Sequence, residues 1–215
     1  MRSTDLSTPD GPIGVLVVDD HPLLRAGLID TIAGQPDMRP VGEAGDGDAA
    51  VRGFADCRPD VTVMDIAMPG MDGVQALRAI RTADPQARVI MLTTFKGDAQ
   101  IRAALEAGAM GFLLKSSVRT DLLDTIRAVH AGRRRVAPEI AQELAQHVGQ
   151  SALSEREITV LRCAALGNAN KRIAVQLAIA EETVKAHMRS ILAKLGARDR
   201  THAVTIGIQR GIIVL

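Results

Sequence analysis

The first half of the chain alternates short apolar runs with longer amphipathic stretches. Four continuous apolar runs and a weaker fifth occupy residues 13–18, 61–64, 88–92, 111–114 and 40–44. Because they are apolar at successive positions, these runs are typical of strands buried on both faces of a parallel sheet. Helical spacing follows each run, over residues 22–33, 48–57, 74–82, 98–107 and 119–131. Five such units predict a doubly wound α/β domain with a five-stranded parallel sheet over residues 13–132.

The pattern changes after residue 132. Residues 133–150 open with three arginines and continue with a polar, alanine-rich stretch, which is typical of a linker. Bulky residues recur at helical spacing within it, at Ile140, Leu144 and His147 or Val148. Part of the linker is therefore predicted to form a short helix. The arginine triplet is interpreted as a solvated charge run, with contact to DNA as the alternative.

Residues 151–215 show four helix patterns and no strand pattern. Ser154 is followed three residues later by Glu157, which is the signature of a capping box. The second pattern is predicted to be capped by Asn170, and the third and fourth cover residues 181–195 and 201–210. These features predict a small all-α, four-helix domain.

Composition narrows the class of protein. The chain has 215 residues, of which 47% are hydrophobic and 24% charged, so it is expected to be globular. Residues 1–12 lack the apolar segment of a signal peptide and are expected to be a short disordered lead-in. Because no apolar run reaches about 18 residues, no membrane span is expected. Cys57 and Cys163 form no CxxC motif and are expected to be buried thiols in the cytoplasm.

The charge differs between the two halves. Residues 1–132 hold 13 Lys and Arg against 18 Asp and Glu, whereas residues 133–215 hold 13 against 7. The basic second half is therefore the candidate for binding a polyanion. With 3 Phe and no Trp or Tyr, the chain lacks the stacking platforms of single-strand binders.

Polar residues follow four of the predicted strands: Asp19, Asp20, Asp65, Thr93 and Lys115. Since ligands of open α/β sheets bind at the carboxyl ends of the strands, these side chains are expected to converge there. Three close carboxylates need a cation, and an all-oxygen ligand set favours Mg²⁺. Such a carboxylate is also a candidate nucleophile that forms an aspartyl phosphate.

Several motifs around these positions resemble the receiver domain of bacterial two-component response regulators. They are Val17-Val18-Asp19-Asp20-His21-Pro22, Met64-Asp65-Ile66-Ala67-Met68-Pro69-Gly70-Met71-Asp72-Gly73, Leu92-Thr93-Thr94 and Gly111-Phe112-Leu113-Leu114-Lys115. The resemblance covers about residues 13–132 and implies a flavodoxin-like fold. It makes Asp65 the phosphoacceptor. It also implies that Mg²⁺ is bound by Asp19, Asp20, Asp65 and the backbone carbonyl of Ala67.

The same resemblance implies a switch. On activation, Thr93 is expected to move with the phosphoryl group, and Lys115 is expected to pair with that group. Phe112 matches the aromatic residue whose rotamer is coupled to the threonine, and the alternative for Phe112 is a plain core position. His21 is not expected to be a ligand, because Mg²⁺ prefers oxygen. Asp72 is expected to be a loop residue outside the site.

The second half contains two helix patterns joined by a tight turn, and the later one is cationic on its open face. This is the helix-turn-helix arrangement for the major groove. Motifs from Leu153 to Leu215 resemble the LuxR-type DNA-binding domain: Leu153-Ser154-Glu155-Arg156-Glu157, Asn170-Lys171-Arg172-Ile173-Ala174, Thr183-Val184-Lys185-Ala186-His187-Met188 and Ile191-Leu192-Ala193-Lys194-Leu195. By this resemblance the base edges are contacted by Lys185, Ala186 and Arg189. Phosphates are held by Lys171, Thr183 and Lys194. The fourth helix supplies the dimer surface through Val204 and Ile208.

Together the two resemblances indicate a response regulator of the NarL/FixJ class. They imply a cytoplasmic transcription regulator that a sensor histidine kinase phosphorylates at Asp65 with Mg²⁺. It is then expected to bind double-stranded promoter DNA as a homodimer, with no membrane partner. The chain is not expected to be an enzyme beyond its own phosphotransfer and slow dephosphorylation.

Two alternatives remain open from the residues. An aspartate-nucleophile phosphatase has a similar sheet, but it needs a second acid two residues after the nucleophile, where this chain has Ala67. A DNA-binding protein with a receiver that only dimerises would not need the complete set of five polar pocket residues.

Overall fold

The computed structural model describes residues 11–94, 98–146 and 153–213. The predicted lead-in over residues 1–10, the helical positions His147 and Val148, the side chain of Leu144 and the predicted domain start at residue 151 lie outside the described parts. The described chain divides into two compact units, which comprise most of residues 11–140 and most of residues 141–213.

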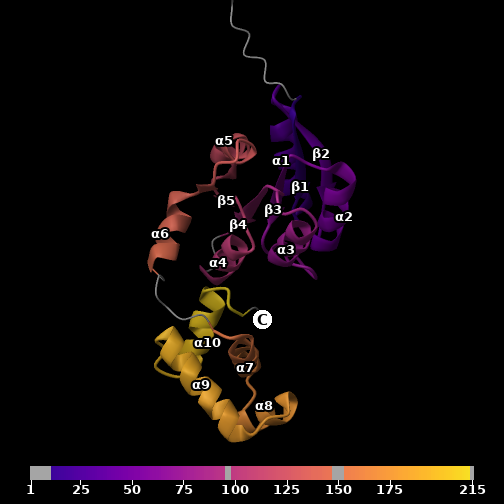
Figure 1. Cartoon of the computed structure of the whole chain (residues 1–215). Coiled ribbons are helices and arrows are strands. Elements are labelled where there is room, and N and C mark those ends of the chain that lie inside the picture. The colour runs from indigo at the N-terminus through magenta and orange to yellow at the C-terminus, as the bar shows by residue number, and fades with distance from the viewer. Residues whose placement is uncertain (1–10, 95–97, 147–152, 214–215) are drawn as a thin grey trace, which may run out of the picture. The chain divides into compact units, whose positions relative to one another are not determined.

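The first unit is built on a parallel sheet (Figure 1). Its strands are β1 (Ile13–Val18), β2 (Met38–Ala44), β3 (Val61–Asp65), β4 (Val89–Thr93), β5 (Gly111–Leu114) and β6 (Arg135–Val136). The order across the sheet is β2-β1-β3-β4-β5-β6, and every neighbouring pair is parallel. The five predicted strands are present in the flavodoxin-like order.

The prediction of five strands was wrong by one, because β6 lies in the segment interpreted as a linker. The Arg135 amide donates to the Met110 carbonyl at 3.0 Å, and Phe112 aligns with Val136. A two-residue edge strand that begins with arginine carries no apolar run, so the hydrophobic pattern could not reveal it. Its position depends on Gly132, whose φ of +76° turns the chain at the end of the preceding helix.

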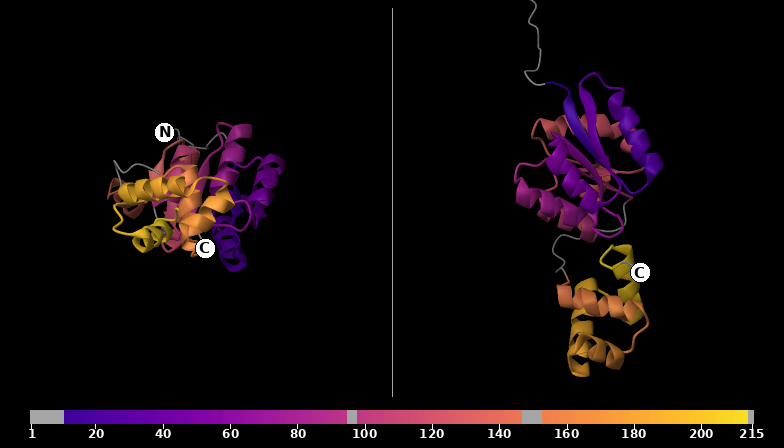
Figure 2. Two further views of the ribbon diagram at one scale, coloured as in Figure 1. Left: turned by 90° about the horizontal axis from the view of Figure 1, so that it is seen from below. Right: turned by 90° about the vertical axis from the view of Figure 1, so that its right-hand side faces the viewer.

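Helices lie on both sides of the sheet (Figure 2). They are α1 (Pro22–Ala33), α2 (Gly47–Cys57), α3 (Gly73–Ala83), α4 (Asp98–Glu106) and α5 (Val118–His130). Val15 and Val17 pack in one buried cluster with residues of α1 and α5. Leu16 points the other way, toward Gly53 of α2, because side chains alternate along a strand. Both faces of the sheet are therefore covered, which explains the continuously apolar strands.

The segment after β6 forms α6 (Pro138–Gln146), as the spacing predicted, with Ile140 fully buried. The second unit contains α7 (Glu155–Ala165), α8 (Asn170–Leu177), α9 (Glu181–Leu195) and α10 (Arg200–Gln209). The capping box is present: Ser154 Oγ accepts from the Glu157 amide, and Glu157 Oε2 accepts from the Ser154 amide. The helix cap predicted at Asn170 was displaced by one residue, since Asn170 is the first residue of α8 and Ala169 precedes it.

The core of the second unit is separate from that of the first. Val160 and Leu161 of α7 pack with Ile173 of α8, and Val184 and Ile191 of α9 complete the centre. Across residues 11–94, 98–146 and 153–213, no helix is long and apolar enough to cross a membrane. Cys57 and Cys163 are free thiols, and both are only half-buried.

Candidate functional site

The carboxyl ends of β1, β3 and β5 bring three charged side chains together. Asp19 follows β1 and is fully buried, while Asp65 ends β3 with 2% of its surface exposed. Lys115 follows β5, and its Nζ lies 2.8 Å from Asp19 Oδ2 and 2.8 Å from Asp65 Oδ2. The Asp65 Oδ1 atom accepts a hydrogen bond of 3.3 Å from the Ala67 amide. The pocket is thus assembled from strands that are distant in sequence.

The electrostatics of this cluster follow from burial and pairing. Burial raises the pKa of Asp65, and the nearby Asp19 charge adds to this, while Lys115 partly offsets both. Burial alone would lower the pKa of Lys115, but its contacts with Asp19 and Asp65 raise it instead. Lys115 is therefore a permanent cation beside the two carboxylates at neutral pH.

The pocket also has the donor set for a hard divalent cation. Ligand atoms of Asp19, Asp20, His21 and Asp65 all lie within 4.8 Å of one another. Asp20 Oδ1 is buried and accepts no hydrogen bond within the described residues, although His21 Nδ1 is 2.6 Å away. The His21 side chain is 68% exposed. Three clustered carboxylates fit Mg²⁺, whose preferred ligands are oxygens.

The other predicted pocket residues lie on the same strands. Thr93 is the last residue of β4, is 6% exposed and aligns with Leu114 of β5. Phe112 is fully buried in β5, where it aligns with Met91. Its burial accommodates both the switch role and the plain core position. Ala67 is exposed in the loop after β3 and contributes its amide to Asp65.

Two residues support this pocket that the sequence did not single out. Arg25 Nη1 donates to the Asp19 carbonyl at 2.7 Å, and its Nε lies 2.9 Å from Glu43 Oε2. Gly73 begins α3 so close to β3 that an added Cβ would lie 2.0 Å from the Asp65 carbonyl oxygen. Arg25 occurs in an ordinary amphipathic pattern and gave no signal. Gly73 stands directly after Asp72, whose side chain caps α3 and lies outside the pocket, as expected.

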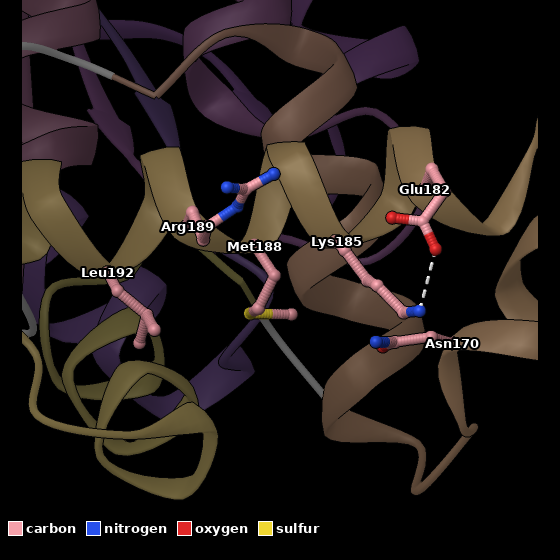
Figure 3. Close-up of a pocket in the computed structure, with 6 residues that line it drawn as sticks. All are labelled: Asn170, Glu182, Lys185, Met188, Arg189 and Leu192. Carbon is pink, nitrogen blue, oxygen red and sulfur yellow. Dashed lines mark hydrogen bonds and ion pairs between the residues drawn. The ribbon is translucent and has the colours of Figure 1, made fainter.

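The second candidate surface is the exposed face of α9. Ala178, with a φ of +52°, makes the turn between α8 and α9. Lys185, Arg189 and Asn170 are among the residues that line a surface hollow of about 400 Å³. Figure 3 shows their side chains. The six predicted DNA-contacting residues divide by burial. Five are exposed, namely Lys171, Thr183, Lys185, Ala186 and Arg189, and one, Lys194, is half-buried.

Two of the predicted DNA-contacting lysines have acidic partners. Lys185 Nζ lies 2.8 Å from Glu182 Oε1 and 3.6 Å from Glu181 Oε1, both on the same helix. Lys194 Nζ lies 2.7 Å from Glu157 Oε2, so it joins α9 to the first turn of α7. The ammonium group of Lys194 is therefore already neutralised inside the domain, which the one-dimensional pattern could not show.

Glu157 is the centre of a buried polar network. Its residue surface is 4% exposed, and its carboxylate also accepts from Ser190 Oγ at 2.6 Å. Burial works against the charged form. Hydrogen bonds from Lys194, Ser190 and Ser154 outweigh it and lower the pKa of Glu157 to about 2. The capping glutamate thus fixes α9 to α7.

The two predicted dimer residues lie on α10. Val204 is half-buried against the domain core, and Ile208 is 40% exposed. Ile208 is the more accessible of the two for another chain.

The chain combines a parallel α/β unit that carries a carboxylate pocket with a helix-turn-helix unit that carries a cationic face. This combination is typical of a receiver domain linked to a DNA-binding domain.

Known protein families that match this chain belong to the same class. Residues 15–127 match the response regulator receiver domain, and residues 151–206 match the LuxR family of bacterial regulatory proteins. The chain belongs to the two-component response regulators with a LuxR-type DNA-binding domain, the NarL/FixJ class. These are DNA-binding regulators of transcription and not enzymes, which rules out the phosphatase alternative.

Similar proteins span almost the whole chain. The transcriptional regulatory protein LiaR of Bacillus subtilis is 38% identical over 199 residues, which cover 89% of this chain and 94% of LiaR. The crystal structure of ChrA, a response regulator of a heme-sensing two-component system, is 42% identical with a TM-score of 0.56, covering 95% of this chain and 100% of ChrA. The response regulator RcsB in complex with DNA has a TM-score of 0.68 at 25% identity, covering 91% of this chain and 98% of RcsB.

Proposed function

We propose that a sensor histidine kinase phosphorylates Asp65 in the presence of Mg²⁺, and that the phosphorylated protein binds promoter DNA as a homodimer in the cytoplasm. The observation that carries this proposal is the buried cluster at the sheet edge. Asp65 is 2% exposed and shares Lys115 with Asp19 at 2.8 Å each. Groups with perturbed pKa values cluster at functional sites, so this arrangement supports a chemical role for Asp65.

Phosphotransfer forms a bond between an Asp65 carboxylate oxygen and phosphorus, while the bond from phosphorus to the donor breaks. The phosphoryl group adds about two negative charges to the pocket. Lys115 lies where it can pair with the new oxygens, and the Thr93 hydroxyl at the end of β4 is the proposed switch donor. Phe112, buried on the adjacent strand, is the proposed partner of Thr93 in the switch.

We assign the metal ligands to Asp19, Asp20, Asp65 and the Ala67 carbonyl. Carboxylate oxygens of Asp19, Asp20 and Asp65 lie within 4.8 Å of one another, which supports a cation at this position. When bound, Mg²⁺ supplies positive charge that stabilises the phosphoryl oxygens during transfer. The protein's own part is to hold the three carboxylates on rigid strand ends and to keep Lys115 beside them.

The DNA-binding role is assigned to α9 and to the start of α8. Lys185, Ala186 and Arg189 are the proposed base readers. Lys171, Thr183 and Lys194 are the proposed phosphate contacts. Lys194 keeps 28% of its side chain exposed, although its Nζ lies 2.7 Å from Glu157 Oε2, so it must exchange that partner to contact a phosphate. The similarity to RcsB, whose structure is a complex with DNA, supports this assignment.

We further propose that residues 13–132 are the receiver, 133–150 the linker and 151–215 the DNA-binding domain, with β6 as an extension of the receiver sheet into the linker. The separate buried cores support this division. In the unphosphorylated protein the receiver occludes the recognition helix. On phosphorylation the dimer forms through Val204 and Ile208 of α10. A usual coupling energy of about 1–3 kcal/mol corresponds to a gain of about 5- to 150-fold in DNA affinity.

Intact-mass measurement tests the central step. We expect the full chain incubated with acetyl phosphate and Mg²⁺ to gain one phosphoryl group, and EDTA to prevent the gain. Asp65→Asn should remove labelling entirely, because it removes the nucleophilic carboxylate. Asp56→Asn, an exposed aspartate of α2, is the matched control and should label normally.

The result also distinguishes the proposal from the remaining alternative, a receiver that only dimerises. If Asp65→Asn labels like the unsubstituted chain, the assignment of the phosphoacceptor is wrong. If the unsubstituted chain does not label under any condition, the proposal of phosphotransfer is wrong, and the alternative of a receiver that only dimerises is favoured.

A further inference from the structure

Three consecutive arginines at the end of the receiver sheet surround a pocket that the proposed function does not use. Arg133, Arg134 and Arg135 line a hollow of about 380 Å³ together with Asp124, Arg127 and Ala128. All three arginines of the triplet are exposed, and none has a carboxylate partner within the described residues. Arg127 differs, because Asp37 at 2.8 Å and Asp124 at 3.3 Å neutralise it.

The backbone that carries the triplet is fixed by hydrogen bonds. The Arg133 amide donates to the Ala128 carbonyl at 2.9 Å, which closes the end of α5 after Gly132. The Arg135 amide donates to the Met110 carbonyl at 3.0 Å, within the pairing of β5 and β6. The backbone of Arg133 and Arg135 is thus fixed, with Arg135 in β6, while all three arginine side chains are exposed.

The lining of the pocket selects the chemistry of its ligand. Five of its six residues are charged and the sixth is Ala128, so charged groups dominate the lining. Small organic ligands are usually bound by predominantly apolar pockets. Guanidinium groups instead match phosphate oxygens, to which they donate paired hydrogen bonds. The hollow therefore fits the phosphates of a polyanion better than a compact organic molecule.

We propose that Arg133, Arg134 and Arg135 bind the phosphate backbone of duplex DNA and add a contact independent of sequence to that of the recognition helix. This inference rests on the proposed DNA-binding function. It concerns residues at and just before β6, outside the segment that matches the LuxR family. Phosphate contacts of this kind raise affinity and carry no sequence information.

The salt dependence of binding tests the inference. The full chain, treated with acetyl phosphate and Mg²⁺, is titrated onto a duplex of arbitrary sequence at several salt concentrations. Each phosphate contact contributes about 0.9 to the slope of log affinity against log salt. Replacing all three arginines by glutamine should therefore flatten the slope by about 0.9 to 2.7. Each lost contact removes about a 3.5-fold change in affinity between 50 and 200 mM salt.

A matched variant controls for net charge. Arg39→Gln, Arg52→Gln and Arg78→Gln together remove the same charge from exposed arginines elsewhere on the receiver. Equal slopes for the two triple variants, with DNA binding by the unsubstituted chain, would overturn this inference and leave the proposed function intact. No DNA binding by the unsubstituted chain would overturn both.

Two further measurements sharpen the result. Replacing the triplet by lysines should retain the slope, because the charges remain. Circular dichroism of the glutamine variant shows whether its loss of slope occurs in a folded chain. Inorganic triphosphate is then titrated onto the full chain by calorimetry. If the glutamine variant loses triphosphate binding while its DNA slope is unchanged, the pocket is a site for small anions and the DNA proposal is wrong.

Discussion

The receiver pocket and the recognition helix both depend on charged side chains, but they hold them in opposite ways. In the pocket, Asp19 is fully buried and Lys115 has 12% of its side chain exposed. These residues come from separate strands, so they meet after the sheet has formed. On α9, Lys185 is 45% exposed and pairs with Glu182 three residues before it. Its environment is mostly that of a single helix.

This difference determines what a substitution changes. Removing one partner of a buried ion pair leaves an uncompensated charge and destabilises the fold. An exposed pair on a helix contributes little to stability, so its loss mainly changes what the surface binds. Substitutions around the pocket should therefore change folding and chemistry together, whereas substitutions on the open face of α9 should change affinity alone.

The largest expected effect comes from the backbone beside the pocket. In Gly73→Ala the new Cβ would lie 2.0 Å from the Asp65 carbonyl oxygen, and neither α3 nor β3 can move freely. We expect the receiver to lose more than about 4 kcal/mol of unfolding free energy, as for other severe steric conflicts. Urea denaturation followed by circular dichroism measures the loss.

Gly27→Ala is the matched control for this glycine. Gly27 is exposed in α1 with no atom within 4 Å of an added Cβ, so alanine should stabilise the receiver by about 0.5–1 kcal/mol. A Gly73→Ala variant as stable as the unsubstituted chain would show that the pocket is not rigidly supported, and the contrast with α9 would fail.

The second prediction concerns Glu157, which is a buried charged group in the DNA-binding domain, as Asp19 and Asp65 are in the pocket. Glu157→Gln removes the buried charge that Lys194 and Ser190 stabilise. Because the pKa of Glu157 is lowered from 4.5 to about 2, its ionisation contributes at most about 3 kcal/mol at neutral pH. That contribution is complete above about pH 5 and is lost as the pH falls toward 2.

Unfolding of the two proteins at several pH values measures this effect. The difference in unfolding free energy between the unsubstituted chain and Glu157→Gln should be largest above pH 5 and should vanish near pH 2. Glu155→Gln, in the same helical turn but exposed, is the control and should show almost no difference. A difference that does not change with pH would mean that Glu157 acts through packing and not through its charge.

Most of the fold could be predicted because the strands and helices of this chain carry strong local patterns. β1 and β5 begin and end at the expected residues, and the capping box marked the start of α7. β6 was missed because two residues cannot display a period. Arg25 and the bond between Glu157 and Lys194 were missed because they join residues 18 and 37 positions apart through tertiary structure.

The candidate site could be predicted to a different degree in each half. The pocket residues stand at strand ends, and the parallel topology alone brings strand ends together, so Asp19, Asp65 and Lys115 were predicted to meet. On α9 the sequence indicates which residues are cationic, but it does not indicate which cations are neutralised. Lys194 and Lys185 both follow the DNA-binding pattern, yet both have acidic partners in the structure.

The smallest expected effects separate base readers from phosphate contacts on the helix-turn-helix. Arg189→Ala should cost about 1–3 kcal/mol on the specific site and little on scrambled DNA, because a paired contact to a base edge is lost. Lys171→Ala should weaken both duplexes alike and flatten the salt slope by about 0.9. Lys185→Ala should resemble Arg189→Ala with a smaller change, because Lys185 must leave Glu182 before it reaches a base. Titrations on cognate and scrambled duplexes at three salt concentrations measure these ratios. If Arg189→Ala leaves the ratio of cognate to scrambled affinity unchanged, Arg189 is not a base reader, whatever happens to total affinity.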